Sequence, residues 1–242
     1  MTSELPTAIV VDKVVITDEL IIMMIKPQIP FSFKPGQYCT IGINGFERPY
    51  SIVSSPHEEN LELFVELIPN GKLSPHLWNL GVGDMIKIRP SAKGIFTLDE
   101  KYQNHLMVAT VTGIAPFLSM VRNYLYSGSD DHRFYILHGA SYIRDLVYRD
   151  ELEDISAKHG NIHYVSTVSR PDDDANQGWN GEEDRVNSLV ERYTEKYSLD
   201  PTHTIAYACG HPDGRRCKKE IKHQRIQGKR REILEGLINQ YW

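Results

Sequence analysis

The stretch that decides the fold is His105-Leu-Met-Val-Ala-Thr-Val-Thr-Gly-Ile-Ala-Pro116. It begins as a short apolar run, continues through small and polar residues from Thr110, and ends on Ala-Pro, a common start of a helix. The pattern predicts a buried strand over His105–Ala109, a tight turn, and a helix over Ala115–Tyr126. A strand followed directly by a helix is the repeating unit of parallel α/β sheets.

The same alternation of strand and helix continues downstream. It predicts, in order, a strand at Phe134–His138, a helix at Tyr148–Lys158, a strand at Ile162–Val168, a helix at Arg185–Tyr193 and a strand at Thr204–Cys209. Such units form a parallel sheet through right-handed crossovers, with helices on both faces. Ligands of these sheets bind at the carboxyl ends of the strands, where the chain carries Thr110–Pro116, Gly139–Ser141, Ser169-Arg170 and Cys209-Gly210.

Upstream, the first 98 residues consist of short strands separated by turn signals such as Asn44-Gly45. The expected strands are Ala8–Thr17, Leu20–Ile25, Gln37–Ile43, Arg48–Val53, Leu61–Ile68 and Met85–Arg89. Evenly spaced short strands without a strong helix predict a small antiparallel barrel. The predicted fold class is therefore β plus α/β, with an antiparallel β-barrel domain at residues 1–98 followed by a parallel-sheet α/β domain at residues 99–242.

Composition excludes several classes of function. The 242 residues carry 27 Lys and Arg against 32 Asp and Glu, a formal charge of −5, so no overall basic field attracts nucleic acid. No apolar run approaches the roughly 20 residues of a membrane span, and the N-terminus lacks the layout of a signal peptide, which predicts a cytoplasmic protein. Three cysteines are too few for an iron–sulfur cluster, and no histidine cluster indicates a metal site, so redox chemistry would need another cofactor.

Two motifs in the first domain combine groups that bind phosphates and aromatic rings. In Arg48-Pro-Tyr-Ser51, alternation along a strand puts the Arg48 guanidinium and the Tyr50 ring on one side. In Gly71-Lys-Leu-Ser74, which precedes a proline, free amides at a helix start and the Ser74 hydroxyl would form an anion site. Each motif has a plain structural alternative, namely a surface Arg–Tyr pair and a helix N-cap after a hairpin.

In the second domain, the turn Thr110–Pro116 stands where a parallel sheet binds a pyrophosphate. The Gly-x-Gly-x-x-Gly fingerprint of the ordinary dinucleotide fold is absent. The segment is therefore either another nucleotide-binding variant or only a turn from strand to helix. Cys209, at the end of the last strand, is either a lining group of that site or a small buried hydrophobe.

The order and spacing of these pieces resemble one family. The collinear motifs are Arg48-Pro-Tyr-Ser51, Gly71-Lys-Leu-Ser74, Thr112-Gly-Ile-Ala-Pro116, Ser169-Arg170 and Tyr207-Ala-Cys-Gly-His-Pro212. From about residue 8 to 212 the chain is similar to the bacterial ferredoxin/flavodoxin–NADP reductases. The resemblance implies an enzyme in which the barrel binds FAD, the parallel-sheet domain binds NADP(H), and electrons pass between NADP(H) and ferredoxin or flavodoxin.

The resemblance also implies residue roles. On the FAD side, the flavin pyrophosphate would be held by Arg48, with Pro49 beside it, the isoalloxazine would stack on Tyr50, and N5 would face Ser51. The adenosine side would be lined by Phe64, Val65, Glu66 and Leu67, and the pyrophosphate capped by Lys72, Leu73 and Ser74. On the nucleotide side, Thr112 and Gly113 would lie between flavin and nicotinamide, and Cys209 and Gly210 would border the nicotinamide. The expected catalytic groups are Tyr50, Ser51 and Cys209.

Cofactor preference depends on groups that bind the 2′-phosphate of NADP. Arg170, next to Ser169, matches one arginine of the family, and Ser141 stands where a second is expected, with Arg144 as a substitute. The third falls in the carboxylate-bearing stretch 180–184, which would repel a phosphate unless Arg185 turns inward. NADP is predicted, and NADH is the alternative.

The C-terminal tail departs from the family pattern. Residues 213–242 carry nine basic against four acidic residues and show no apolar stripe. Two explanations fit this departure. The first is a change of reading frame in the gene, and the second is a divergent basic helix in which Trp242 supplies the family's terminal aromatic. We expect a monomer that meets an acidic electron carrier through Lys34, Lys72 and Lys93. The alternatives are an NADH-dependent reductase component of an oxygenase and a non-catalytic FAD-binding electron-transfer subunit.

Overall fold

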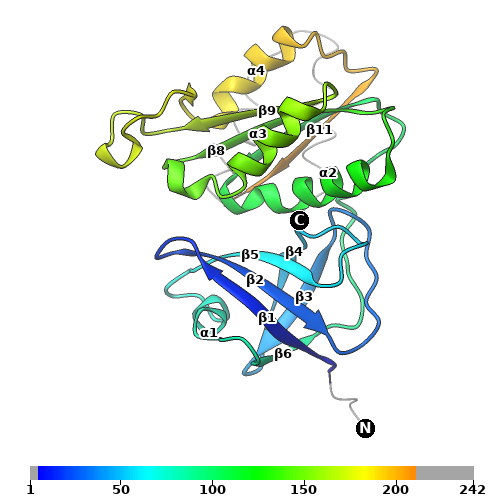
Figure 1. Ribbon diagram of the computed structural model, residues 1–242, viewed down its shortest axis with the longest axis vertical. Coiled ribbons are helices and arrows are strands. Elements are labelled where there is room, and N and C mark those ends of the chain that lie inside the picture. The colour runs from blue at the N-terminus through cyan, green and yellow to red at the C-terminus, as the bar shows by residue number, and fades with distance from the viewer. Residues whose placement is uncertain (1–4, 211–242) are drawn as a thin grey trace. The chain divides into compact units, whose positions relative to one another are not determined.

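The computed structural model describes residues 5–210, which fall into two compact units (Figure 1). The basic tail, the end of the Tyr207–Pro212 motif and Trp242 lie outside these residues. Among the described residues, unit one holds residues 5–98 and the helix α2 (Ala115–Ser127), and unit two holds residues 99–114 and 128–210. The units differ from the predicted domains in α2, which lies beyond residue 98 yet groups with unit one. Within the described part, no helix is both long enough and apolar enough to cross a bilayer.

Unit one is built on a six-stranded antiparallel sheet in the order β4-β3-β6-β1-β2-β5. Its elements are β1 (Thr7–Val15), β2 (Leu20–Pro27), β3 (Tyr38–Ile43), β4 (Phe46–Ser51), β5 (Leu61–Glu66), the helical turn α1 (Ser74–Trp78) and β6 (Met85–Ile88). An isolated bridge from Ile52 to Leu63 joins the chain after β4 to β5, the opposite edge of the sheet. This link curves the sheet toward closure, and the antiparallel half of the predicted fold class is confirmed.

The hairpin between β3 and β4 follows from its turn residues. Asn44 and Gly45 have φ values of 52° and 81°, the left-handed conformation that a two-residue hairpin turn requires. The turn fixes a register in which Cys39 lies opposite Tyr50. Alternating aliphatic side chains fill the core beneath these strands: Val10, Ile21, Met23, Ile25, Ile41, Leu63, Val65 and Ile88.

Helix α2 is attached to unit one by polar contacts as well as by its apolar residues. The Ser119 hydroxyl donates to the Ser54 carbonyl at 2.8 Å. Arg122 Nη1 lies 2.7 Å from Glu62 Oε2, and both side chains are largely buried. Largely buried charges are stable only when they are paired, so this ion pair helps to fix where α2 lies on unit one.

Unit two contains a five-stranded parallel sheet in the order β10-β9-β8-β7-β11. Its elements are β7 (Asn104–Thr110), the 3₁₀ turn η1 (Val111–Ile114), β8 (Arg133–Ala140), η2 (Ile143–Asp145), α3 (Arg149–Lys158), β9 (Ile162–Val168), η3 (Asp174–Asn176), β10 (Glu182–Glu183), α4 (Val186–Lys196) and β11 (Thr204–Cys209). The predicted strands and helices all occur, β9 and β11 with the predicted ends and the others with shifted ends, which confirms the α/β half of the fold class. The sequence did not predict β10, because a pair of glutamates carries no strand signal.

Side-chain alternation divides the sheet of unit two into two faces. Helix α4 packs on the face that carries Leu106, Tyr135 and Leu137. His138 follows Leu137 along β8 and therefore lies on the other face. In the register of the sheet it stands beside Ala109 of β7, close to the carboxyl ends of both strands.

Candidate functional site

Strand β4 presents the Arg48–Ser51 motif on unit one. Arg48 and Pro49 are exposed, and Tyr50 and Ser51 are half-buried. The Tyr50 ring packs against the barrel core, and burial raises its pKa to about 12, so the phenol is neutral. The positive charge of Arg48 acts on the same pKa in the opposite direction, which requires the two groups to be near each other. A cation and an aromatic ring are thus available together on one exposed strand.

The second barrel motif is arranged differently from the expectation. The Ser74 hydroxyl accepts from the Ile68 amide at 2.9 Å and donates to the Ile68 carbonyl at 3.3 Å. The helix α1 begins at Ser74, as the Ser-Pro pair indicated, but its N-cap is Leu73, which makes no side-chain cap, so the alternative of a Ser74 N-cap does not apply. Gly71 is needed here because a Cβ would lie 2.9 Å from the Ile68 carbonyl oxygen. Ser74 therefore closes the turn, and Lys72 extends from that turn as an exposed cation.

Some of the residues expected along the adenosine and pyrophosphate side are core residues. Val65 and Leu73 are buried with the barrel cluster, so only their main-chain atoms could meet a cofactor. Phe64 is buried as well, whereas Glu66 and Leu67 are half-buried. The sequence pattern did not distinguish the side chains of this segment that fill the core from those that face outward.

On unit two, the turn after β7 and the end of β11 are in close backbone contact. A Cβ on Gly113 would lie 2.1 Å from the Cys209 carbonyl oxygen, and one on Gly210 would lie 1.9 Å from Thr110 Oγ1. Both positions require glycine, because any side chain would push the two segments apart. The structure thereby brings together Thr112, Gly113, Cys209 and Gly210, four residues expected at the nicotinamide.

The Cys209 thiol is neutral at physiological pH. Burial raises its pKa to about 11, and the hydrogen bond to the Gly210 backbone opposes this only in part. A thiolate nucleophile is therefore not available at this position. Thr112 is half-buried, so it and Cys209 bring only small uncharged side chains to this end of the sheet.

A buried histidine that the sequence did not single out supports the same turn. His138 is fully buried, its Nε2 lies 3.1 Å from the Val111 carbonyl oxygen, and its Nδ1 lies 3.0 Å from the Tyr164 hydroxyl. Val111 itself has a φ of 43°, which is unusual for a β-branched residue. The available sequence signal was a histidine in an apolar strand just before its carboxyl end.

Two arginines, one from the loop after β8 and one from the loop after β9, stack on the ring of the same tyrosine. The guanidinium carbons of Arg144 and Arg170 lie 4.9 and 5.3 Å from the centre of the Tyr142 ring, and Arg170 donates to the Tyr142 hydroxyl. Stacking on an aromatic ring holds a planar guanidinium in a fixed orientation. Tyr142 was not predicted, although it sits between Ser141 and Arg144, which were.

Asn176 ties these two loops together and was also missed. Its side chain is buried, accepts from the Ile143 amide at 2.8 Å, and donates to the carbonyls of Ser141 and Arg170 at 2.9 and 2.8 Å. Ser169 begins the second loop, and its amide donates to the Ala140 carbonyl. One amide side chain therefore sets the spacing of the arginine-bearing loops.

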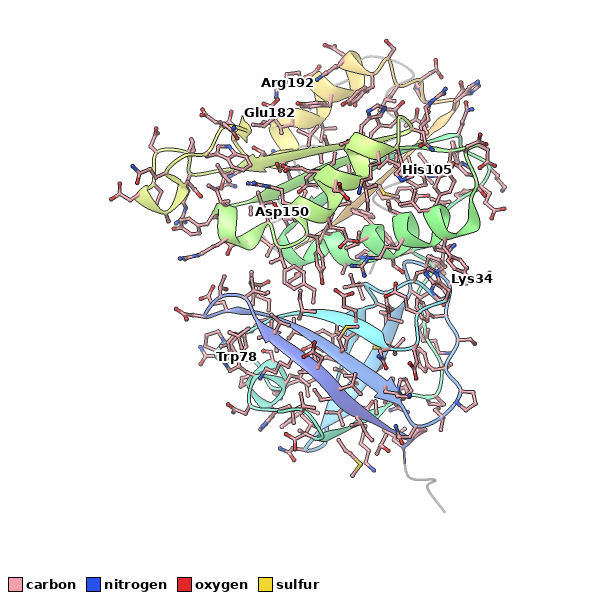
Figure 2. The ribbon with its side chains drawn as sticks, viewed as in Figure 1. Lys34, Trp78, His105, Asp150, Glu182 and Arg192 are labelled. Carbon is pink, nitrogen blue, oxygen red and sulfur yellow. The ribbon has the colours of Figure 1, made fainter. Side chains whose placement is uncertain are left out.

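The carboxylate-bearing stretch expected to oppose a phosphate is partly neutralised. Arg192 and the Tyr193 hydroxyl both bind the Glu182 carboxylate, and the pKa of Glu182 is lowered, chiefly by Arg192. Figure 2 shows Glu182 and Arg192 next to each other on unit two. Arg185 is exposed at the N-cap of α4 and does not turn inward.

Comparison with known proteins places these features in a family. Residues 7–96 match an oxidoreductase FAD-binding domain, and residues 107–214 match an oxidoreductase NAD-binding domain. Ferredoxin–NADP reductase B of Sorangium cellulosum is 33% identical over 189 residues, which cover 74% of this chain and 75% of that protein. The chain belongs to the ferredoxin–NADP reductase family.

Other members of the ferredoxin–NADP reductase family are similar over shorter stretches. The flavodoxin/ferredoxin–NADP reductase of Escherichia coli K12 is 35% identical over 165 residues, 64% of each chain. A Buchnera aphidicola reductase of the same name is 35% identical over 143 residues, 57% of its length. The chain thus matches less than two thirds of these two relatives.

Solved structures of the ferredoxin–NADP reductase family share the fold. The enzyme from Neisseria gonorrhoeae, crystallised with FAD and NADP, gives a TM-score of 0.76 at 24% identity, covering 88% of both chains. The enzyme from Plasmodium falciparum gives a TM-score of 0.77 at 24% identity, covering 97% of this chain and 96% of that one. At this identity the likeness concerns the architecture alone.

Proposed function

We propose that the protein passes electrons between NADP(H) and a one-electron carrier of the ferredoxin or flavodoxin kind through bound FAD. The observation that carries the proposal is the pair Arg144 and Arg170, both stacked on Tyr142 at the carboxyl ends of β8 and β9. Ligands of parallel sheets bind at this edge, and paired guanidinium groups favour a phosphate. NADP differs from NAD by such a phosphate on its ribose.

The residues of unit one fit FAD in both charge and shape. Arg48 is an exposed guanidinium suited to a pyrophosphate, and Tyr50 offers a neutral ring for stacking. Lys72 adds a second exposed cation on the turn after β5. FAD, when bound, would accept a hydride and release electrons singly; that chemistry belongs to the cofactor.

On unit two, the residues of the chain would position the nicotinamide. Gly113 and Gly210 keep backbone close to the site, because a side chain at either would collide with the neighbouring strand end. Thr112 and the neutral Cys209 thiol bring no charge next to the ring that exchanges hydride. A small, uncharged lining lets reacting atoms approach closely and leaves little room for water.

The carrier is proposed from charge and from the names of relatives. Lys34, Lys72 and Lys93 are exposed on loops of unit one, as expected for contacts with an acidic protein. Relatives bear the name flavodoxin/ferredoxin–NADP reductase, and another is the electron transfer component of toluate 1,2-dioxygenase from Pseudomonas putida, 29% identical over 184 residues. A cytoplasmic location and a monomeric state stay predictions, the second to be checked by light scattering.

One assay on the purified protein tests the proposal. We expect flavin absorbance, and ferricyanide reduction with a kcat/KM at least tenfold higher for NADPH than for NADH. A preference for NADH would favour the reductase component of an oxygenase, and bound FAD without turnover would favour a non-catalytic electron-transfer subunit. Folded protein that takes up no FAD would refute the assignment of Arg48, Tyr50 and Ser51.

A further inference from the structure

The turn that follows β7 is held in a costly conformation. Val111 has a φ of 43°, in the left-handed region that a β-branched residue rarely enters. Strain of this kind persists only where the surroundings enforce it, and it concentrates at functional sites. Thr112 and Gly113 come directly after Val111 and belong to the proposed nucleotide site. The question is which group of the protein enforces the conformation.

His138 is placed to do so. It lies on β8 beside Ala109 of β7, and the Nε2 of its fully buried ring is 3.1 Å from the Val111 carbonyl oxygen. A carbonyl oxygen only accepts, so Nε2 must carry the proton of this hydrogen bond. Burial lowers the pKa of His138 to about 4, which leaves the imidazole neutral with a single N–H.

Tyr164 fixes which nitrogen carries that proton. Its hydroxyl lies 3.0 Å from His138 Nδ1, and burial raises its pKa well above the usual range, so it stays protonated. With Nε2 protonated, Nδ1 of the neutral ring is an acceptor and the tyrosine donates to it. The three groups form a directed chain of donors from Tyr164 of β9, through His138 of β8, to the main chain after β7.

The hydrogen bond also orients the next amide. In a trans peptide the carbonyl and the N–H point in opposite directions. Because the Val111 carbonyl points at His138, the Thr112 N–H points away from His138. Gly113 follows, and it packs so closely on Cys209 that no side chain would fit. The turn is thus held at both ends, by His138 before Thr112 and by backbone packing after it.

We infer that His138 is a positioning residue for the pyridine nucleotide: it holds the Val111 peptide so that the Thr112 amide faces the ligand. The inference rests on the proposed function, since it assigns a role within the same nucleotide site. It predicts that the loss of one buried hydrogen bond, made on the side away from the ligand, weakens nucleotide binding.

The test measures binding of NADP⁺ to the FAD-loaded protein by titration calorimetry. His138→Leu should weaken binding about tenfold, the effect of losing one buried hydrogen bond and leaving its acceptor unpaired. FAD content should be unchanged. His138→Gln, whose amide can replace the Nε2 donor, should restore affinity to within about threefold of the original.

His105→Leu is the matched control. His105 is equally buried and lies on the neighbouring strand β7, but it contacts His132 and Tyr207 and not the turn. This variant should unfold at a lower temperature and bind NADP⁺ with unchanged affinity. Equal losses of affinity in His105→Leu and His138→Leu would show a general loss of packing and overturn the inference.

Val111→Gly tests the strain directly. Glycine adopts positive φ without penalty, so the turn should need less support from the imidazole. On a Val111→Gly background, His138→Leu should weaken NADP⁺ binding by threefold or less. An undiminished tenfold loss there would overturn the inference, as would wild-type affinity in His138→Leu alone.

The remaining outcomes are separable. If His138→Leu does not fold, His138→Asn, whose amide is too short to reach the Val111 carbonyl, replaces it and must show the same loss. If the wild-type protein binds FAD but neither NADP⁺ nor NAD⁺, the proposed function fails. If the wild-type protein binds NADP⁺ and the affinity does not depend on His138, only the inference fails.

Discussion

The two ends of the parallel sheet in unit two use similar residues for different purposes. At the amino end, the His105 ring lies 3.1 Å from His132 and 3.4 Å from the Tyr207 hydroxyl. Near the carboxyl end, His138 makes a similar pair of contacts, to Tyr164 and to the Val111 carbonyl. Both histidines are fully buried on adjacent strands. Figure 2 marks His105 on unit two.

The difference lies in what each histidine holds. His105 contacts the side chains of His132 and Tyr207 and the backbone of Tyr102 before β7, and burial and the nearby His132 lower its pKa to about 3. His138 contacts the backbone of a strained turn in the proposed nucleotide site. Burial of a polar ring is therefore not in itself a sign of function. The sign is the hydrogen bond to an irregular main-chain segment at the edge where ligands bind.

Glycines at the two ends give the largest expected contrast. Gly113→Ala places a Cβ 2.1 Å from the Cys209 carbonyl oxygen, so it should lower the free energy of unfolding by about 3 kcal/mol and abolish NADP⁺ binding. Gly160→Ala, in the turn before β9, meets no atom within 4 Å. Its effect should stay within about 0.5 kcal/mol. Urea denaturation checks both, and equal effects would contradict the close packing of the strand ends.

Low pH should reduce the folding stability through both histidines to a similar extent, whereas only His138 should matter for nucleotide binding. The folded-state pKa values are about 3 for His105 and about 4 for His138, against 6.5 for an unperturbed histidine. Below pH 6.5 the unfolded chain binds more protons than the folded one, so stability falls as the pH falls. Each histidine should remove about 2 kcal/mol by pH 5.

Urea midpoints at pH 7, 6 and 5 measure this loss. Replacing either histidine by Leu should make the stability curve shallower by a similar amount over that range. Only the variant at His138 should also bind NADP⁺ more weakly at pH 7. A curve that keeps its slope in both variants would show that neither histidine is buried in the neutral form.

These ends also show how far the sequence could be interpreted. The strand–turn–helix pattern at His105–Pro116 predicted β7, η1 and α2, because apolar runs and small turn residues are local signals. The resemblance indicated Thr112, Gly113, Cys209 and Gly210, which the structure brings together. Neither the local pattern nor the resemblance could distinguish the role of His138 from that of His105. Both are histidines in apolar strands, and only the tertiary register decides which groups each one contacts.

The cluster of Arg144 and Arg170 could be predicted only in part, because some of its residues follow a local pattern and others do not. Arg144, Arg170 and the two serines follow strand ends, where ligand-binding residues are expected. Tyr142 and Asn176 act through stacking and through hydrogen bonds to residues far along the chain, and these contacts have no local sequence pattern. At Ser74 the local signal was sufficient for the helix start but not for the side chain, because the hydroxyl binds Ile68 instead of capping the helix.

Arginines at the two ends should differ in their effect on cofactor choice. Arg170→Ala removes a guanidinium from the proposed phosphate site and should raise the KM for NADPH about 20-fold, the effect of losing a charge-assisted hydrogen bond. The KM for NADH should change less than about twofold. Arg133→Ala, at the exposed start of β8, is the control and should alter neither value. Equal increases for both nucleotides with Arg170→Ala would contradict a 2′-phosphate site.

The smallest expected effects come from removing the hydroxyls of the two tyrosines that contact His138 and His105, and these two substitutions are closely matched. Tyr164 lies 3.0 Å from Nδ1 of His138, and Tyr207 lies 3.4 Å from Nδ1 of His105. Replacing either by Phe removes one buried hydroxyl and should lower the free energy of unfolding by about 1 kcal/mol. Tyr164→Phe should also weaken NADP⁺ binding about threefold, because the His138 ring is then free to carry its proton on Nδ1 and lose the donor to Val111.

Tyr207→Phe should leave NADP⁺ affinity unchanged despite the comparable loss of stability. Its hydroxyl also accepts from the Asp99 amide at 3.0 Å, so the loss falls on the loop before β7 and not on the turn after it. Denaturation and calorimetry on the same two samples measure both quantities. If Tyr207→Phe weakened binding as much as Tyr164→Phe, the nucleotide site would respond to the stability of the whole sheet. Affinity reduced by Tyr164→Phe alone would show that it depends on the orientation of one peptide at the carboxyl end.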